Sequence, residues 1–271
     1  MQSGAIRPLN NMLPRNLFNA EHEAFRETVR KFYAKEVVPN IEKYEQQQHV
    51  DRELWNKAGA MGLLCATMPE AYGGSGVDRL YSMILIEEQA YAMDSSTGFS
   101  LHSDIVANYI NNFGSEAQKH YWLTRMASGE TVTAIAMTEP GTGSDLQAVR
   151  TTAVLDGDDY IINGSKIFIT NGYLCDMAIV VCKTGDTDKG SANLSLIIVE
   201  ADRVGFSKGK PLNKIGMKGQ DTCELFFDHV RVPKENLLGM EGMGFMMLMK
   251  ELAWERMLVA IICQAGAEAA L

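Results

Sequence analysis

Apolar side chains recur every three to five positions through most of residues 1–129, which is the repeat of an amphipathic helix. This repeat predicts five helices, with Pro39 as a kink or break in the first: 20–46, 51–62, 79–93, 95–112 and 115–129. Asp51 is a candidate N-cap of the second helix, and Asp78 starts the third. We therefore expect residues 1–129 to form an all-helical N-terminal domain.

The pattern changes at residue 130, where short runs rich in β-branched residues are separated by Gly, Asp and Asn turns. These runs predict a β domain of sandwich or barrel type over residues 130–238, with a hairpin turn at 156–159. The helical repeat then returns, so residues 239–271 are interpreted as the first helix of a C-terminal helical bundle. The predicted fold class is α+β with several domains, and the helix–strand–helix order excludes a Rossmann domain.

Composition and charge narrow the class of protein further. The 271 residues include 25 Lys and Arg against 34 Asp and Glu, a net charge of −9, which disfavours nucleic-acid binding. No apolar run approaches the roughly 20 residues that a membrane helix needs. The 5 cysteines are scattered without a C-x-x-C pair, which favours reduced thiols in the core of an intracellular protein over disulfides or a metal site.

Two segments of the predicted β domain are candidate cofactor contacts. The sequence TEPGTGSD at 138–145 follows a predicted strand, and its glycine peptides can direct N–H groups at an anion. Further along, Phe168 and Thr170 lie two apart on a predicted strand and so share one face, where they would suit a planar ring. The alternatives are an ordinary strand-end loop and an ordinary alternating strand.

Candidate acid–base residues occur on the last predicted helix. Glu251 and Glu255 lie four residues apart on one helix face, and a partly buried member of such a pair could act as a base. A helical glutamate is more often a solvated surface residue, so that alternative stays open. The Gly-rich segment at 72–78 is better interpreted as an interhelical turn than as a phosphate cradle, and no histidine receives a role.

Four segments, taken together and in their order along the chain, point to a protein family. They are FGSEAQKHYW, AMTEPGTGSDLQ, DYIINGSKIFITNG and FFDHVRVPKENLLG. Their combination resembles the acyl-CoA dehydrogenase family along essentially the whole chain. The resemblance implies a helical N-terminal domain, a central β domain and a C-terminal helical domain, which together bind FAD and an acyl-CoA thioester.

The resemblance also implies the residues that hold the flavin. Thr138 would bond the pyrimidine side of the ring, Gly143 and Ser144 would lie near the pyrophosphate and CoA, and Thr170 would approach flavin N5. Phe168 would pack on the ring, where many family members have Trp. The complete set of implied cofactor contacts is Ile135, Met137, Thr138, Gly143, Ser144, Phe168, Ile169 and Thr170.

The position of the catalytic base separates branches of the family. KELAWER resembles the long-chain and isovaleryl branch, whose base lies on the first helix after the β domain, and Glu255 occupies that position. Glu251 then becomes an orienting or surface residue. The residues implied to contact substrate are Ser144, Met246, Trp254 and Arg256.

The implied reaction is α,β-dehydrogenation of a medium- to long-chain acyl-CoA to the trans-2-enoyl-CoA, with an electron-transfer flavoprotein as electron acceptor. We expect a homotetramer in the full-length protein, located in the bacterial cytoplasm or the mitochondrial matrix. The sequence stops within the first helix of the third domain, so we expect a truncated chain that binds little flavin by itself. The alternatives are a non-catalytic fragment of such an enzyme and an oxidase on the same fold.

Overall fold

The first part of the chain is helical in the computed structural model, which describes residues 15–185 and 193–271. The helices among residues 15–130 of the described chain are α1 (Ala20–Phe32), α2 (Ile41–Gln47), α3 (Arg52–Ala60), α4 (Arg79–Tyr91), α5 (Ala107–Phe113) and α6 (Glu116–Ala127). Between α1 and α2 the chain forms a π-turn and then a 3₁₀ turn over Val38–Asn40. This break surrounds Pro39 as expected, because proline has no N–H to continue the α-helical ladder.

The two helices with predicted N-caps begin where expected, at Arg52 after Asp51 and at Arg79 after Asp78. Asp78 accepts a hydrogen bond from the Leu80 N–H at 2.8 Å and caps α4, as predicted. Asp51 makes no such bond, because its carboxylate is engaged by Lys43 and Gln47. The helix expected from residue 95 begins later, at Phe99, and continues through the π-helix Leu101–Val106 into α5.

The delayed start has a local cause in the turn that precedes this helix. The Asp94 carboxylate accepts bonds from the backbone N–H groups of Ser96 and Thr97 at 2.9 and 3.1 Å, and also from both of their hydroxyls. These bonds stabilise a turn instead of helical backbone, since short polar side chains compete with the helix for N–H groups.

The middle of the chain forms one mixed sheet, which confirms the expected β domain. Its strands are β1 (Thr133–Ala136), β2 (Thr152–Asp156), β3 (Asp159–Thr170), β4 (Met177–Lys183), β5 (Leu194–Glu200), β6 (Phe206–Lys208), β7 (Thr222–Pro233) and β8 (Leu237–Leu238). The order is β6-β7-β3-β2-β4-β5-β8, and β1 pairs with β4 in parallel. The predicted hairpin joins β2 and β3, with Asp156 opposite Asp159.

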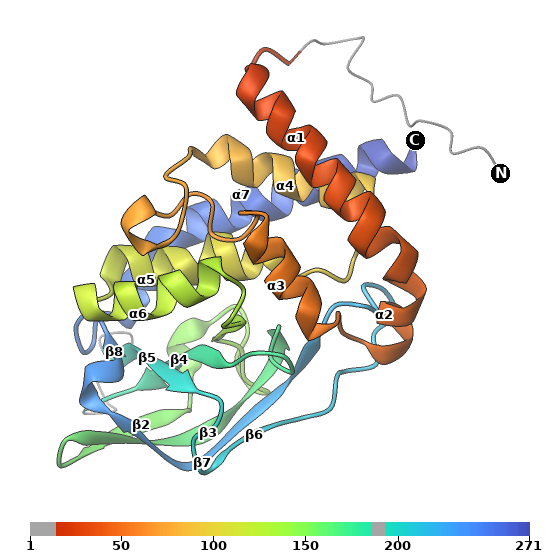
Figure 1. Cartoon of the computed structure of the whole chain (residues 1–271). Coiled ribbons are helices and arrows are strands. Elements are labelled where there is room, and N and C mark those ends of the chain that lie inside the picture. The colour runs from red at the N-terminus through yellow and green to blue at the C-terminus, as the bar shows by residue number, and fades with distance from the viewer. Residues whose placement is uncertain (1–14, 186–192) are drawn as a thin grey trace.

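The sheet folds over so that its two halves enclose an apolar core (Figure 1). On β4, Ala178, Val180 and Cys182 contribute to this internal core together with residues of β3 and β7. The alternate β4 residues Met177 and Ile179 belong to a second core, which they share with helical residues. Because side chains alternate along a strand, β4 supplies a wall to each of the two cores.

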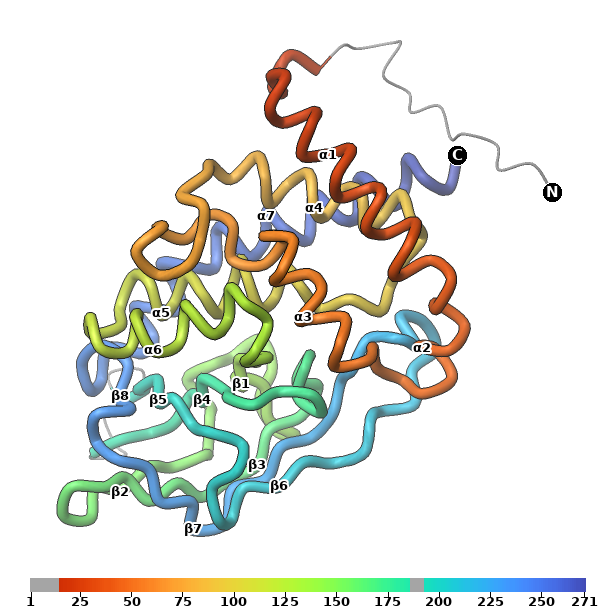
Figure 2. The backbone as a smooth tube through the Cα atoms, viewed as in Figure 1, coloured from red at the N-terminus to blue at the C-terminus, as the bar shows by residue number. Residues whose placement is uncertain are grey.

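The last helix, α7 (Gly244–Ala270), returns from the sheet and runs along α4 to end beside the first helices (Figures 1 and 2). At its start a Cβ on Gly244 would lie 2.7 Å from the Leu194 carbonyl oxygen, so only glycine fits against β5. At its far end the Tyr91 hydroxyl donates to Glu268 at 2.6 Å. Within residues 15–185 and 193–271, no helix is long and apolar enough for a membrane span.

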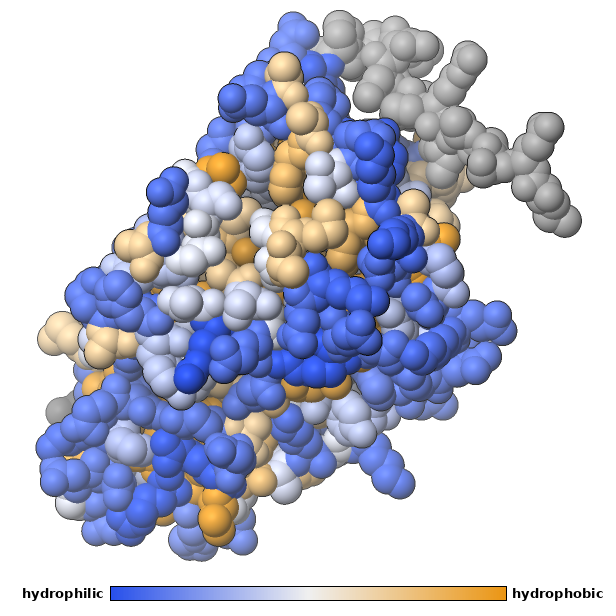
Figure 3. Space-filling view, in the orientation of Figure 1, coloured by the Kyte–Doolittle hydropathy of each residue, from blue (hydrophilic) through white to orange (hydrophobic). Residues whose placement is uncertain are grey.

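The distribution of apolar side chains on the surface and the burial of the cysteines can be compared with what the composition predicted. The face seen in Figure 3 is largely hydrophilic, with apolar side chains gathered over the helical half. All five cysteines are free thiols, and four of them are buried. Cys263, by contrast, is exposed on α7, so the expectation of core thiols holds for four positions only.

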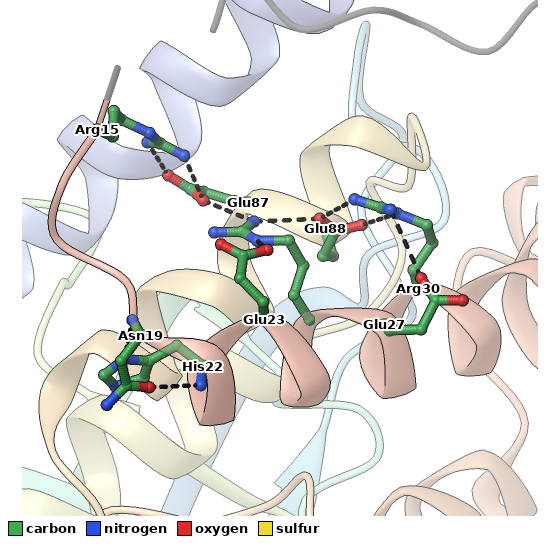
Figure 4. Close-up of polar contacts among 9 residues, drawn as sticks. Arg15, Asn19, His22, Glu23, Glu27, Arg30, Glu87 and Glu88 are labelled. Atoms are coloured by element: carbon green, nitrogen blue, oxygen red, sulfur yellow. Dashed lines mark hydrogen bonds and ion pairs between the residues drawn. The ribbon is translucent and has the colours of Figure 1, made fainter.

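A buried charge network ties α1 and the residues before it to α4 (Figure 4). Glu87 and Glu88 are adjacent on α4 and only 2% exposed. Arg15 binds Glu87 through two hydrogen bonds of 2.5 and 3.0 Å, and Arg30 binds Glu88 in the same way at 3.0 Å. Arg26 lies between them and contacts Glu87 at 2.9 Å and Glu88 at 3.1 Å. Each buried carboxylate is therefore compensated by guanidinium groups, as desolvated charges require.

We predict that Arg26→Met lowers the free energy of unfolding by about 3 kcal/mol, because two buried carboxylates lose their shared counter-ion. Urea or thermal unfolding followed by circular dichroism measures the change. Arg231→Met is the matched control, since Arg231 pairs with Asp156 and Asp159 at the surface and its loss should leave the stability nearly unchanged. Equal destabilisation by both variants would contradict the importance of burial.

Candidate functional site

The first predicted cofactor segment is the loop after β1. Ile135 is buried in the core, Met137 and Thr138 are half-buried, and Gly143 and Ser144 are exposed. Among the described residues, no protein acceptor takes the backbone N–H groups of Thr138, Gly143 and Ser144. A Cβ added to Gly143 would meet no atom within 4 Å. The loop thus presents unpaired donors beside open space, which is what an anionic or acceptor-rich ligand needs.

A buried ion pair between β3 and this loop holds the loop in place. Lys166 on β3 is 0% exposed, and its ammonium donates to the Glu139 carboxylate at 2.9 Å and to the Met137 carbonyl at 3.1 Å. Glu139 also accepts from the N–H groups of Arg150 and Thr151 at 2.6 and 2.9 Å and from the Thr151 hydroxyl at 2.6 Å.

Glu139 therefore stays ionised in the interior. Burial raises the pKa of its carboxyl, but Lys166 and Thr151 outweigh burial and bring that pKa below its ordinary value. Burial lowers the pKa of the Lys166 ammonium, and the Glu139 carboxylate opposes that effect.

The second predicted segment departs from the regular strand that the sequence indicated. The register of β3 against β7 shifts between Lys166 and Ile169, which marks a β-bulge. Phe168 occupies the bulge at φ 60° and is 63% exposed, whereas Ile169 is buried and Thr170 is half-buried. The bulge interrupts the simple alternation that the prediction assumed. It turns the Phe168 ring outward, where it offers a flat apolar surface.

The two segments lie side by side. The Ile167 N–H donates to the Thr138 carbonyl at 2.9 Å, and Lys166 reaches Met137 from the same stretch of β3. Unpaired N–H groups, hydroxyls and an exposed aromatic ring thus gather on neighbouring pieces of backbone. This donor set fits a planar, acceptor-rich ring with an attached phosphate chain, as in a flavin dinucleotide.

The predicted base, Glu255, lies on α7 and faces α5. Its carboxylate accepts a hydrogen bond from the Tyr109 hydroxyl at 2.8 Å. Burial raises the pKa of Glu255 above its ordinary value, the Tyr109 hydroxyl opposes this, and the nearby Glu251 adds to the rise. A carboxylate in this setting has a greater affinity for a proton than one in water.

Glu251, one turn earlier on the same helix face, has a different role from the surface residue considered in the sequence analysis. It is 5% exposed and accepts a hydrogen bond from the Asn112 amide at 2.9 Å. Because Asn112 and Tyr109 both belong to α5, the two glutamates hold α7 to that helix.

The other residues predicted to contact substrate occupy different positions along α7. Met246 is 53% exposed, and Arg256 is exposed as well. Trp254 is half-buried under the Arg79 guanidinium, which lies 4.4 Å from the ring centroid. Their contact with substrate stays a prediction.

The helix formed by Leu101–Val106 and α5 connects the two parts of the site. At one end His102 is fully buried: its Nε2 lies 3.1 Å from the Met126 carbonyl and its Nδ1 lies 2.9 Å from the Thr133 hydroxyl on β1. Burial lowers the pKa of His102 to about 4, so this residue is neutral. Seven residues later, about 10 Å along a helix axis, Tyr109 binds Glu255.

Sequence reasoning missed three of these residues: Tyr109, Glu139 and Lys166. Lys166 left a signal, because it occupies an inward position on a strand whose other inward residues, such as Ile162, are apolar. A lysine there needs a buried counter-ion. Tyr109 left none, since 146 residues separate it from Glu255.

Comparison with known proteins matches the N-terminal part and the middle part of the chain to two domains of one family. Residues 19–130 match the family model described as acyl-CoA dehydrogenase, N-terminal domain. Residues 134–230 match the model described as acyl-CoA dehydrogenase, middle domain.

Two curated relatives match nearly the whole chain. The mitochondrial long-chain specific acyl-CoA dehydrogenase of Sus scrofa is 49% identical over 269 residues, which are 99% of this chain and 63% of that protein. The mitochondrial isovaleryl-CoA dehydrogenase of Oryza sativa subsp. japonica is 37% identical over 260 residues, 95% of this chain and 63% of that protein. This chain therefore spans about 63% of the length of these relatives.

Solved structures agree with this similarity. The crystal structure of acyl-CoA dehydrogenase from Geobacillus kaustophilus matches with a TM-score of 0.91 and 46% identity, covering 94% of this chain and 67% of that one. An acyl-CoA dehydrogenase from Bacillus anthracis complexed with FAD matches with a TM-score of 0.86 and 36% identity, covering 92% of this chain and 43% of that one. Fold and sequence agree: the chain belongs to the acyl-CoA dehydrogenase family.

Proposed function

We propose that the protein is an FAD-dependent dehydrogenase that forms a trans double bond between Cα and Cβ of a medium- to long-chain acyl-CoA. The observation that carries this proposal is the Glu255 carboxylate, which is bonded to Tyr109 and made more basic by burial. A carbon acid such as an acyl thioester needs a base of this kind in a site that excludes water.

The loop after β1 and the bulge of β3 would hold the cofactor. The N–H and hydroxyl of Thr138 would bind the pyrimidine edge of the ring, and the N–H groups of Gly143 and Ser144 would bind the pyrophosphate. Phe168 would cover the ring, with Thr170 near its central nitrogen. FAD, when bound, supplies the ring that accepts the β-hydrogen of the thioester with its electron pair.

Glu255 would remove the α-proton, so the thioester loses one proton and one hydride and gains one C=C bond. Tyr109 would hold the carboxylate of Glu255 in place by its hydrogen bond. Glu251, bonded to Asn112, would fix α7 relative to α5 and keep the base at a constant position.

The substrate class follows from the relatives and from the place of the base. The Sus scrofa relative is named a long-chain specific enzyme, and it is 49% identical to this chain. A series of saturated acyl-CoA esters of increasing length, mixed anaerobically with the FAD-loaded protein, tests the class through loss of flavin absorbance. Bleaching by medium- and long-chain esters is expected. Bleaching by short or branched esters alone would contradict the assigned chain length.

The reduced protein would pass its electrons to an electron-transfer flavoprotein, as the family resemblance implies. Assembly into a homo-oligomer would cover apolar side chains that α7 exposes, such as Met257 and Val259, which are 52% and 60% exposed. A mitochondrial or bacterial location would follow that of the relatives.

We predict that Glu255→Gln slows anaerobic flavin reduction by a bound acyl-CoA roughly 100- to 10,000-fold, the usual contribution of a general base. Stopped-flow absorbance of the FAD-loaded variant measures the rate. Glu251→Gln is the matched control on the same helix face and should have a much smaller effect. A near-wild-type rate for Glu255→Gln would place the base elsewhere.

We predict that Tyr109→Phe moves the low-pH limb of the flavin-reduction rate to higher pH. The Tyr109 hydroxyl stabilises the ionised form of Glu255, so its loss raises the pKa of Glu255 further and leaves less carboxylate at a given pH. The pH dependence of flavin bleaching measures the shift. Tyr72→Phe, which removes a surface bond to Glu116, should leave the profile unchanged. A shift to lower pH for Tyr109→Phe would contradict the role of this bond.

A further inference from the structure

The ammonium group of Lys166 has an unusual setting for a lysine. It is fully buried, and it binds a backbone carbonyl as well as the Glu139 carboxylate. The ion pair with Glu139 compensates the charge, so the bond to the Met137 carbonyl is an additional contact. That contact directs a positive charge at one peptide group of the cofactor loop.

The N–H of this peptide points in the direction opposite to its carbonyl. The Met137 carbonyl and the Thr138 N–H belong to one peptide unit, and no cis peptide occurs among the described residues. In a trans peptide the C=O and N–H point in opposite directions. Because the carbonyl points at buried Lys166, the Thr138 N–H points away from it, and no described protein group accepts that N–H.

A cation on the carbonyl strengthens the donor at the other end of the peptide. Hydrogen bonds that share one peptide polarise each other, and the effect is larger where water is excluded. The Ile167 N–H also holds the Thr138 carbonyl at 2.9 Å, so the orientation of this residue is fixed on both sides. Thr138 therefore presents an oriented, polarised N–H next to exposed Phe168.

We propose that Lys166 is a positioning residue for the cofactor: with Glu139 as its counter-ion, it orients and polarises the Met137–Thr138 peptide so that the Thr138 N–H binds an acceptor at the ring edge. This inference rests on the proposed function, because it takes the bound ring to be a flavin. A stronger donor at the pyrimidine edge stabilises the negative charge that the ring gains on reduction. Lys166 thus raises both the affinity for FAD and the flavin reduction potential.

Three variants separate this role from simple support of the fold. Lys166→Met leaves Glu139 as an uncompensated buried charge, which should destabilise the protein. The double variant Glu139→Gln/Lys166→Met removes both charges and should recover much of the thermal stability. Lys31→Met, at an exposed lysine of α1, is the control for the same chemical change at the surface.

The double variant provides the decisive measurement. We expect its FAD affinity, measured by flavin fluorescence titration, to be roughly tenfold weaker than that of the wild type, because a charge-assisted bond is lost. Its bound flavin should have a more negative reduction potential in dye-coupled titration. Wild-type affinity and potential in the stable double variant would overturn the proposal, since support of the fold would then be the whole role of the pair.

A third readout does not require FAD. The amide ¹⁵N resonance of Thr138 reports polarisation of its peptide, and it should shift in Lys166→Met and in the double variant but not in Lys31→Met. If the full-length protein bound no FAD, the proposed function would fail, while this resonance would still test the effect of Lys166. An unchanged Thr138 resonance in both Lys166 variants would overturn the inference itself.

Discussion

Strand β4 is buried on both of its faces, and this constraint holds the two parts of the molecule together. One set of alternate side chains packs against the helices, and the other fills the space inside the folded sheet. A slip of one residue would exchange the two sets, so the register of β4 is strongly determined. Since β1 pairs with β4 in parallel, the point where β1 ends and the cofactor loop begins is determined too.

Buried carboxylates in this protein differ in what compensates them. Glu88 is held by Arg26 and Arg30, and Glu139 by Lys166 and backbone N–H groups, so both are stabilised as anions. Glu255 receives one hydrogen bond, from the neutral Tyr109, among the described residues. Burial raises the pKa of Glu255 and so favours its protonated form, as burial also raises the pKa of Asp104, to about 7. Glu255 is suited to take up a proton, and its place on α7 rather than its pKa alone distinguishes it as the candidate base.

Local patterns in the sequence predicted the elements well and their irregularities poorly. The helical repeat, the Asp78 cap and the turn between β2 and β3 were predicted correctly, because each depends on residues within a few positions of one another. The late start of the helix at Phe99 was missed, since it depends on the Asp94 turn. The bulge at Phe168 was missed as well, because it arises from pairing with β7, more than fifty residues away.

The sequence by itself determined the order of elements, the family and the identity of Glu255 as candidate base, since these follow from short motifs and their order. The tertiary structure decided which partners give those residues their chemistry. Tyr109 reaches Glu255 across 146 residues, and Lys166 reaches Glu139 across 27. The pKa of a carboxyl depends on burial and on nearby donors and charges, and folding brings these together from distant parts of the chain.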